Sequence, residues 1–338
     1  MAKGRVKLVD IAKALDVSVG LVSCVLSGKA KENRISKNLA KKVIDKANEL
    51  GYQANQMARG LRTGKSGIIG LVVADIANPY FGKMARFIEN EASKLGYQVM
   101  FGSSDEDSNK LNSIVNVFLS RQVDGLVIVP VNGSEEFLKN LKNQSIPFVF
   151  IDRYSEGVDA ETICTDNFEG GYQLTNLLIS KGCKKVAAFV YDTNLTNNSE
   201  RIKGYESCLK NAGIYDGNED LVYEVGFKHM EQRLESSIKL ALKNKCDAFF
   251  FANNALGVHS IKYFKDNGVT IPNDIKIVSF DNPEAFQIAE PSITCYEQPI
   301  EQMSSKAIKI LFDKLENSSL VQNRTYLLPG NLIVRNSC

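Results

Sequence analysis

The 338-residue sequence has few of the residues that build metal centres and disulfide frameworks. It contains two histidines, His229 and His259, and neither stands at the spacing of a metal-ligand pair. Its seven cysteines are scattered and include no C-x-x-C pair. That usage is typical of free thiols in a reducing compartment. We therefore expect no disulfide framework and no metal site.

Long apolar runs are also missing. The longest are short strand-like stretches such as Ile68–Ala74, whereas a membrane-spanning helix needs about 20 apolar residues. Residues 1–8 are basic, but no apolar segment of a signal peptide follows them. With 44% hydrophobic and 24% charged residues, the composition is that of a globular protein, and the length favours two or three domains. We expect a cytoplasmic protein that does not bind membranes.

Enzyme motifs are equally scarce. No G-x-G-x-x-G follows a predicted strand, so a dinucleotide cofactor has no support, and no G-x-S-x-G nucleophile elbow is present. The segment Gly60–Ser66 resembles a P-loop fragment, but it is one residue short and precedes a strand. Serine and asparagine neighbours suggest that Asp105, Glu106 and Asp107 lie in a solvated loop. A sugar-converting enzyme would therefore lack catalytic residues, and we expect neither enzymatic activity nor a cofactor.

Charge is distributed unevenly along the chain. Residues 1–65 contain 14 basic and five acidic residues, a net charge of +9. The remaining 273 residues contain 27 basic and 34 acidic residues, a net charge of −7. A small basic segment joined to a larger acidic one predicts a polyanion-binding head on a body that does not bind nucleic acid.

The basic head is predicted to form three short helices. The first carries one apolar stripe at helical spacing, made of Leu8, Ile11, Ala12 and Leu15. Ser18 is a good N-cap for a second helix, and Ser36 is one for a third. Two short helices joined by a tight turn, the second with small residues on its outer face, are typical of a helix-turn-helix. A protein-binding helical bundle with a solvated basic face would share this pattern, and that alternative stays open on pattern alone.

The acidic body alternates short β runs with amphipathic helices, which predicts parallel sheets covered by helices on both faces. The series restarts near Asp166, which suggests two doubly wound lobes. The predicted strands are Ile68–Val73, Val99–Phe101, Leu126–Val129, Phe148–Ile151, Val186–Val190, Ala248–Phe251 and Lys276–Phe280. The clearest predicted helices are Phe81–Leu95, Leu111–Arg121, Arg201–Ala212 and Val258–Asn267.

Polar and aromatic residues follow several of these strands. Open α/β sheets bind ligands beyond the carboxyl ends of their strands, so these residues are candidates for one site. They are Asn78-Pro79-Tyr80-Phe81, Asp152-Arg153, Arg201, Asn253-Asn254 and Asp281-Asn282. Carboxylates, amides and a guanidinium beside an aromatic ring suit a polyhydroxylated ligand. Each single polar residue could instead serve as a loop cap or in an Asx-turn.

Several short motifs together resemble the lactose-repressor (LacI/GalR) family of transcription regulators, and the resemblance runs through the whole chain. The motifs are Val9-Asp10-Ile11-Ala12, Val17-Ser18-Val19, Val22-Ser23, Leu50-Gly51-Tyr52 and Ala58-Arg59-x-Leu61. The resemblance implies a helix-turn-helix head over residues 1–52 and a hinge helix and linker over 53–66. It further implies a core over 67–338 with two lobes of periplasmic-binding-protein type, which bind effector and form the dimer.

The resemblance also implies how the chain is divided between the lobes. The chain would cross three times, near Asp166, Tyr296 and Leu327. The first lobe would then comprise residues 67–165 and 297–325, and the second residues 166–296 and 326–338. Two such lobes form a cleft that can close on a ligand.

For DNA binding, the resemblance implies contacts from the head and the hinge. The implied residues are Lys7, Ser18, Val19, Gly20, Ser23, Cys24, Ser27, Lys29, Arg34, Asn55, Ala58 and Leu61. The hinge helix, too short to be stable alone, would form on the DNA minor groove with Leu61 as the wedge between bases. The base-reading positions Val19, Gly20 and Cys24 cannot make bidentate base contacts, which shifts readout toward thymine methyls, the charged loop 29–34 and DNA shape. Ala54 stands where the family usually has proline.

For the effector, the resemblance implies a set of cleft residues: Tyr80, Phe81, Asp152, Asn197, Arg201, Phe227, Asn253 and Asp281. We expect a regulator, acting as a repressor, that binds a pseudo-palindromic operator as a homodimer and senses a carbohydrate. A purine effector is the main alternative. A sugar-binding protein without a DNA role would need no basic head.

Overall fold

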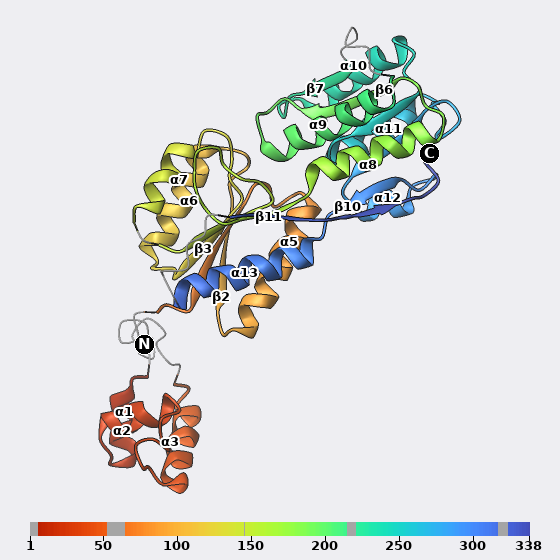
Figure 1. Cartoon of the computed structure of the whole chain (residues 1–338). Helices are drawn as coiled ribbons and strands as arrows, with labels where there is room; N and C mark the ends of the chain where they lie inside the picture. The colour runs from red at the N-terminus through yellow and green to blue at the C-terminus, as the bar shows by residue number, and fades with distance from the viewer. Residues whose placement is uncertain (1–5, 53–64, 145, 215–220, 317–323) are drawn as a thin grey trace. The chain divides into compact units, whose positions relative to one another are not determined.

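The computed structural model describes residues 6–52, 65–144, 146–214, 221–316 and 324–338. The chain forms two compact units, residues 1–66 and 67–338. The predicted hinge residues Asn55, Ala58 and Leu61, together with Ala54, lie outside the described residues. Figure 1 labels the helices and several of the strands.

Within residues 6–52, the head unit forms three helices, α1 (Leu8–Leu15), α2 (Val19–Leu26) and α3 (Lys37–Glu49). Both expected caps are present: Ser18 Oγ accepts a hydrogen bond from the Leu21 N–H (3.2 Å), and Ser36 Oγ accepts one from the Leu39 N–H (3.3 Å). The head core is small and consists of Ile11, Ala12, Val22, Val25, Val43 and Ala47. Local capping and one apolar seam therefore define this unit.

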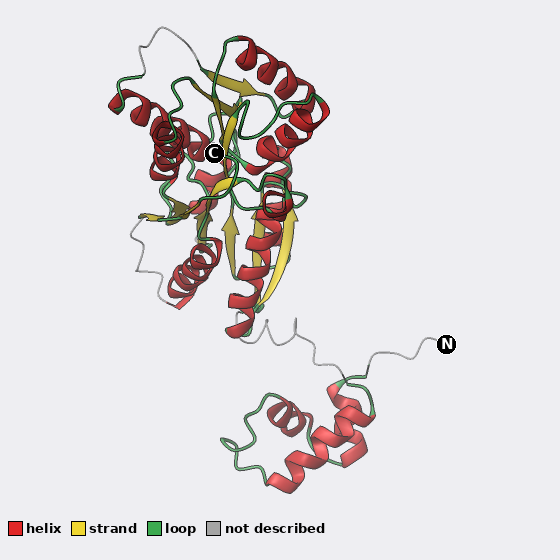
Figure 2. Ribbon diagram, turned by 90° about the vertical axis from the view of Figure 1, so that its right-hand side faces the viewer, coloured by secondary structure: helices red, strands yellow, loops and turns green. Residues whose placement is uncertain are grey.

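The described residues of the core unit form two six-stranded sheets, which confirms the predicted pair of doubly wound lobes. The first sheet has the order β11-β5-β4-β3-β1-β2, and all its neighbours are parallel. The second has the order β12-β10-β9-β8-β6-β7, in which only β12 runs antiparallel to its neighbour β10. Figure 2 shows the helices packed around the sheets.

The first lobe is built from two chain segments. Its strands are β1 (Ile68–Val73), β2 (Gln98–Ser103), β3 (Gly125–Ile128), β4 (Phe148–Ile151), β5 (Thr162–Thr165) and β11 (Thr325–Leu328). Its helices are α5 (Pro79–Lys94), α6 (Ser108–Ser120), α7 (Glu135–Lys142) and α13 (Ile300–Glu316). Helices α5 and α13 lie side by side although more than 200 residues separate them in sequence (Figure 1).

The second lobe follows the same plan. Its strands are β6 (Val186–Tyr191), β7 (Val222–Val225), β8 (Ala248–Phe251), β9 (Lys276–Phe280), β10 (Thr294–Glu297) and β12 (Asn331–Ile333). Its helices are α8 (Asn167–Ser180), α9 (Thr196–Asn211), α10 (Met230–Lys243), α11 (Asn254–Asp266) and α12 (Glu284–Ile288). Phenylalanines dominate its interior, with Phe249, Phe250 and Phe251 fully buried in β8.

The chain passes between the lobes three times, after β5, after β10 and after β11. The boundary expected between residues 325 and 326 needs correction, because it falls inside β11. All four residues of β11 pair with β5 and so belong to the first lobe. Glu297, expected to open the return segment of the first lobe, is instead the last residue of β10 in the second. Isolated three- and four-residue strands carry too little periodicity to be placed by pattern.

Candidate functional site

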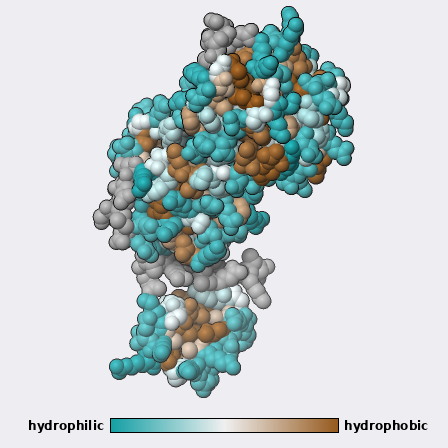
Figure 3. Space-filling view, turned by 45° about the vertical axis from the view of Figure 1, so that its right-hand side comes forward, coloured by the Kyte–Doolittle hydropathy of each residue, from teal (hydrophilic) through white to brown (hydrophobic). Residues whose placement is uncertain are grey.

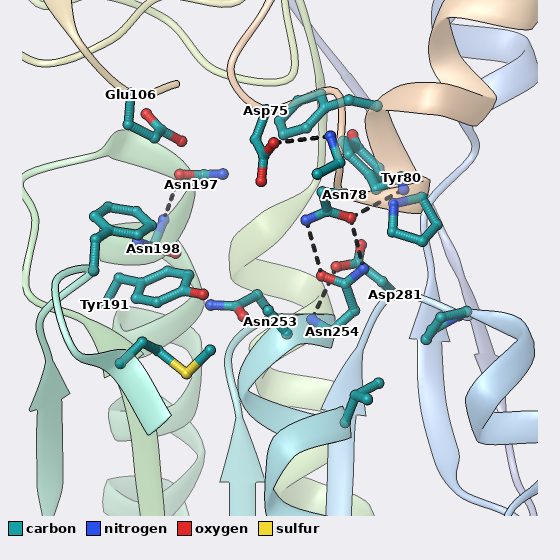
Figure 4. Close-up of a pocket in the computed structure, with 18 of the residues that line it drawn as sticks. Asp75, Asn78, Tyr80, Glu106, Tyr191, Asn197, Asn198, Asn253, Asn254 and Asp281 are labelled. Atoms are coloured by element: carbon teal, nitrogen blue, oxygen red, sulfur yellow. Dashed lines mark hydrogen bonds between the residues drawn. The ribbon is translucent and has the colours of Figure 1, made fainter. Parts of the chain in front are cut away.

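A cavity of about 960 Å³ lies between the two lobes, beyond the carboxyl ends of their parallel strands. Both lobes contribute to its walls (Figure 4). All eight residues predicted to bind effector line this one cavity: Tyr80, Phe81, Asp152, Asn197, Arg201, Phe227, Asn253 and Asp281. The structure therefore brings the predicted effector residues together.

The first lobe contributes a buried pair of polar side chains. Asp152 directly follows β4 and has a left-handed backbone conformation, with φ of 75°. The Tyr80 hydroxyl, near the start of α5, donates a hydrogen bond of 2.6 Å to Asp152 Oδ1. Burial, followed by the charge of Asp152, raises the pKa of Tyr80 well above its usual value. Tyr80 therefore remains a neutral hydrogen-bond donor at physiological pH.

Asp281 is the corresponding carboxylate of the second lobe. It follows β9 with φ of 66°, and its oxygens accept hydrogen bonds from Gln298 Nε2 (2.6 Å) and the Asn254 N–H (3.2 Å). Burial raises the pKa of Asp281, although the charge of Arg201 and both hydrogen bonds act in the opposite direction. The internal partners of Asp281 occupy both of its oxygens.

Gln298 connects the two lobes at the second crossing of the chain. Its amide nitrogen donates to Asp281, and its Oε1 accepts a hydrogen bond of 2.6 Å from the Thr165 hydroxyl. The Tyr80 hydroxyl lies 3.2 Å from the same Oε1. Near it, Asn78 and Asn254 exchange amide hydrogen bonds of 2.8 and 3.2 Å across the cleft (Figure 4). These contacts fix the spacing of the lobes in this conformation.

Arg201 is buried in α9, and two of its guanidinium nitrogens donate hydrogen bonds within the second lobe. Its Nε donates to Asn167 Oδ1 (2.8 Å), and its Nη1 donates to the carbonyl oxygen of Ala252 (2.6 Å). The guanidinium carbon lies 3.9 Å from the centre of the Phe280 ring. Burial lowers the pKa of Arg201, although the neighbouring carboxylates Asp281 and Asp152 oppose that shift. Arg201 thus holds α8, α9 and β8 together as well as lining the cavity.

A second buried arginine pairs with a residue that the sequence analysis placed in a solvated loop. Arg153 Nη1 and Nη2 each lie 2.9 Å from a carboxylate oxygen of Glu106. Burial alone would lower the pKa of Arg153, but the charge of Glu106 and its hydrogen bonds raise it above the usual value. Asp105 and Asp107 are exposed, as expected for a solvated loop. Glu106 is not, because it folds over the cavity to reach Arg153.

The two polar atoms of the Asn253 amide differ in their bonding, because within the described ranges its oxygen has a partner and its nitrogen has none. Its Oδ1 caps α11 by accepting a hydrogen bond of 3.1 Å from the Leu256 N–H. Its Nδ2 is buried and has no hydrogen-bond partner among the described residues. Since an unsatisfied buried donor costs about 1–3 kcal/mol, this group suits a ligand acceptor. The oxygen of the Asn253 amide therefore serves as a cap, while its nitrogen is left without a described partner at the cavity.

Aromatic rings form the wall beside Asn253. Tyr191 and Phe227 stack with ring centres 4.1 Å apart, and Phe227 remains 42% exposed. Asn197 lies nearby, and its Oδ1 accepts a hydrogen bond of 2.9 Å from the Asn198 N–H (Figure 4). An exposed aromatic face beside amide groups can pack on the apolar face of a ring-shaped ligand.

Glu106, Tyr191 and Gln298 line the cavity but were not among the predicted effector residues. Tyr191 is the last residue of β6, and Gln298 follows β10 directly. The rule that ligands bind beyond strand ends already points to Tyr191, because the predicted strand Val186–Val190 ends next to it. No strand was predicted before Gln298, so the rule could not find that residue. Glu106 lies three residues after β2, and its partner Arg153 is 47 residues away, so no local pattern marks it.

The head presents its predicted DNA-contacting residues around α2. Ser18, Val19, Gly20 and Ser27 are exposed, and Ser23 and Cys24 are half-buried. The Cys24 thiol donates to the carbonyl oxygen of Lys29 (3.5 Å), and Ser27 Oγ donates to that of Cys24 (3.0 Å). The first of these bonds joins α2 to the basic loop, and the second closes the end of α2. Lys29 and Arg34 in the loop are exposed, as is Lys7 before α1. Figure 3 shows hydrophobic surface on the head framed by hydrophilic residues.

The described residues show neither a metal-binding cluster nor a membrane-spanning helix. Over the described ranges, no group of three or more His, Cys, Asp or Glu residues could hold a metal ion. All seven cysteines are free thiols. Within the same ranges, no helix is both long and apolar enough to cross a bilayer.

Comparisons with known proteins agree with this architecture. A family model for the periplasmic binding protein-like domain matches residues 175–338. The transcriptional regulator RegA of Clostridium saccharobutylicum is 30% identical over 329 residues, covering 97% of this chain and 98% of RegA.

Two solved structures extend the comparison. A periplasmic binding protein/LacI transcriptional regulator from Alkaliphilus metalliredigens, complexed with D-xylulofuranose, has 26% identity and a TM-score of 0.69 over 80% of this chain and 98% of its own. The lac repressor dimer bound to operator has 20% identity and a TM-score of 0.85 over 98% and 99% of the two chains, and it shows the shared fold. By whole-length identity, by fold and by the head motifs, the chain belongs to the LacI family of DNA-binding transcription regulators.

Proposed function

We propose that this regulator senses a carbohydrate bound between the lobes of its core, and that the ligand controls its affinity for operator DNA. The observation that carries the proposal is the cavity itself, in which polar groups from both lobes surround an unpartnered amide donor at Asn253 and an exposed aromatic ring at Phe227. The relative from Alkaliphilus metalliredigens was solved with a sugar, D-xylulofuranose, which supports this ligand class. The individual site residues are part of the proposal.

The proposed mechanism uses the lobes as a two-state element. A ligand that bridges them would favour one lobe arrangement over another, and DNA affinity would change by the difference in its affinity for the two states. The hydrogen bonds between Asn78 and Asn254 span the two lobes, so they would break if the lobes moved apart. A single head can read one half-site, so we propose that the protein binds a pseudo-palindromic operator as a homodimer and acts as a repressor.

The first test is a thermal-shift screen of the full-length protein against sugars and purines. A ligand at 100 times its dissociation constant adds about 2.7 kcal/mol of stability. Stabilisation by at least one sugar is the expected result. Stabilisation by purines alone would replace the carbohydrate with a nucleobase while leaving the regulator assignment in place. The ligand should be recovered chemically unchanged, because we propose binding without turnover.

Asn253→Ser is the sharpest variant for locating the ligand. Serine keeps an oxygen that can cap α11 but removes the open amide donor. We expect sugar binding to weaken about tenfold or more while the melting temperature of the free protein changes little. Asn267→Ser, at the other end of the same helix, is the matched control. Unchanged binding in Asn253→Ser would place the ligand elsewhere. Asp281 is a poorer probe because its oxygens already serve internal partners.

A further inference from the structure

The walls of the cavity carry an excess of negative charge. Among the described lining residues, seven have carboxyl groups and three have permanently basic side chains. The carboxyl groups belong to Asp75, Asp105, Glu106, Asp107, Asp152, Asp281 and Glu284, and the basic side chains to Arg153, Arg201 and Lys228. A negatively charged ligand entering this cavity meets a repulsive field unless a basic group is free to bind it.

Both buried arginines already have partners within the protein. Arg201 is committed to Asn167 and to the Ala252 carbonyl group, and its guanidinium rests on Phe280. Arg153 has the geometry that would suit a phosphate group, since its two terminal nitrogens form a fork. Glu106 already occupies both of those nitrogens at 2.9 Å, and Asp152 Oδ2 lies 3.4 Å from Nε. The third basic residue, Lys228, is exposed to water.

Glu106 is held in place by its own backbone. It follows Asp105, and both residues have left-handed backbone conformations, with φ of 57° and 52°. The Glu106 N–H donates to the carbonyl oxygen of Ala74, at the end of the neighbouring strand β1 (3.2 Å). This places the carboxylate at the cavity wall near Asn197 (Figure 4). The Glu106 side chain is 19% exposed and that of Arg153 only 4%, so little solvent screens the pair.

We propose that Glu106 makes this cavity selective for uncharged ligands by occupying the arginine fork that a phosphate group would otherwise bind. The inference rests on the proposed function, because it identifies the effector as an uncharged sugar. A sugar phosphate carries about −1.5 to −2 charges at neutral pH and would have to displace Glu106 while facing the other carboxylates. Hydroxyl groups face no such barrier, because they accept and donate hydrogen bonds without a charge.

The direct test measures inorganic phosphate binding by calorimetry on the full-length protein, at constant ionic strength. The variants are Glu106→Ala, which frees the fork, and Glu106→Gln, which removes the charge but keeps the side-chain length. The control is Asp105→Asn, which removes one charge from the same wall but leaves the fork occupied, since Asp105 pairs with Lys110. The basic head contributes equally in all four proteins, so differences between them report on the cavity.

We expect Glu106→Ala to bind phosphate about tenfold to a hundredfold more tightly than the wild type, since hydrogen bonds between charged groups have that strength. Glu106→Gln should show a smaller gain, and Asp105→Asn almost none. Equal gains in Glu106→Ala and Asp105→Asn would overturn the proposal, because general charge reduction would then explain them. The absence of any gain in both Glu106 variants would overturn it as well.

A second arm compares each neutral sugar with its phosphate ester: ribose with ribose 5-phosphate, glucose with glucose 6-phosphate, and fructose with fructose 6-phosphate. In the wild type, any neutral sugar that binds should bind at least tenfold more tightly than its phosphate ester. In Glu106→Ala, the ratio of these two affinities should be smaller. A wild-type preference for an ester would contradict the proposal. If the phosphate experiment succeeds and no sugar in a broad screen binds, the role of Glu106 stands and the carbohydrate assignment fails.

Discussion

The head and the core of this regulator are organised in opposite ways. The head has a six-residue interior and a strongly basic surface, and its predicted contacts lie on the outside of α2 and the adjoining loop. The core carries a net negative charge, buries four hydrophobic clusters, and places its predicted contacts in an interior cavity. Surface charge should therefore govern DNA binding by the head. Buried hydrogen bonds and close packing should govern ligand binding by the core.

The comparison predicts its largest difference in salt dependence. Raising salt from 50 to 200 mM should weaken DNA binding by about 10³–10⁵-fold if the dimer makes six to ten phosphate contacts. The same change should alter the affinity of the core for an uncharged sugar by less than about threefold, because no ion is released. Fluorescence anisotropy with a duplex selected from a random library measures the first quantity, and calorimetry the second.

Neutralising the basic loop together with the first turns of α3 sharpens the difference in salt dependence between head and core. Replacing Lys29, Lys31, Arg34, Lys37, Lys41 and Lys42 with glutamine should reduce both the DNA affinity and the slope of its salt dependence. Sugar binding should not change in this variant. If the neutralised head bound DNA as tightly as the wild type, a surface role for its charge would be untenable.

The next largest effect is expected at Arg201. In Arg201→Ala, Asn167 and the Ala252 carbonyl group lose their donor, and buried Asp281 loses the positive charge that favours its ionised form. Removing one partner of a buried charged network costs about 3–5 kcal/mol, so core unfolding in urea should shift to clearly lower concentration. Lys203→Ala, two residues further along α9, removes only an exposed ion pair with Glu200 and should cost less than about 1 kcal/mol. Equal effects of the two variants would refute the structural role assigned to Arg201.

Close packing between α8 and α9 gives a third prediction. A Cβ atom added at Gly204 would lie 2.0 Å from the Phe168 carbonyl oxygen, so Gly204→Ala should push the helices apart and destabilise the core by about 1–3 kcal/mol. Gly82, inside α5, has no neighbour within 4 Å of such an atom. There the same substitution should stabilise the core by about 0.5–1 kcal/mol, because alanine favours a helix. Thermal unfolding of the two variants should therefore shift in opposite directions.

The contrast between local and distant determinants also explains what the sequence could predict. Ser18 and Ser36 mark helix starts through bonds that span three residues, and the apolar stripe of α1 lies within eight. The longer core strands were equally visible, because buried parallel strands read as continuous apolar runs. These features depend on neighbours in the chain, so the head and most of the two sheets could be predicted before the structure.

The remaining features depend on partners far apart in sequence. Arg153 finds Glu106 47 positions away, and Tyr80 meets Gln298 218 positions away. Strand β11 joins the first lobe only because it pairs with β5. The ends of the predicted strands identified Asp152, Asn253 and Asp281, which do line one cavity. The sequence carries no information about which atoms of these residues are already bonded to other parts of the protein.

The smallest effect tests the local determinants of the head. Ser18→Ala removes the N-cap of α2, the helix that presents Val19 and Gly20. We expect a loss of about 1 kcal/mol in head stability, seen as faster amide hydrogen exchange over residues 19–26, with core exchange unchanged. Ser18→Asn, a good cap, should restore the protection. If alanine left exchange in α2 unchanged, packing on the six-residue interior, and not capping, would hold the helix. In what stabilises them, the head and the core would then differ in size alone, because both units would depend on buried apolar contacts.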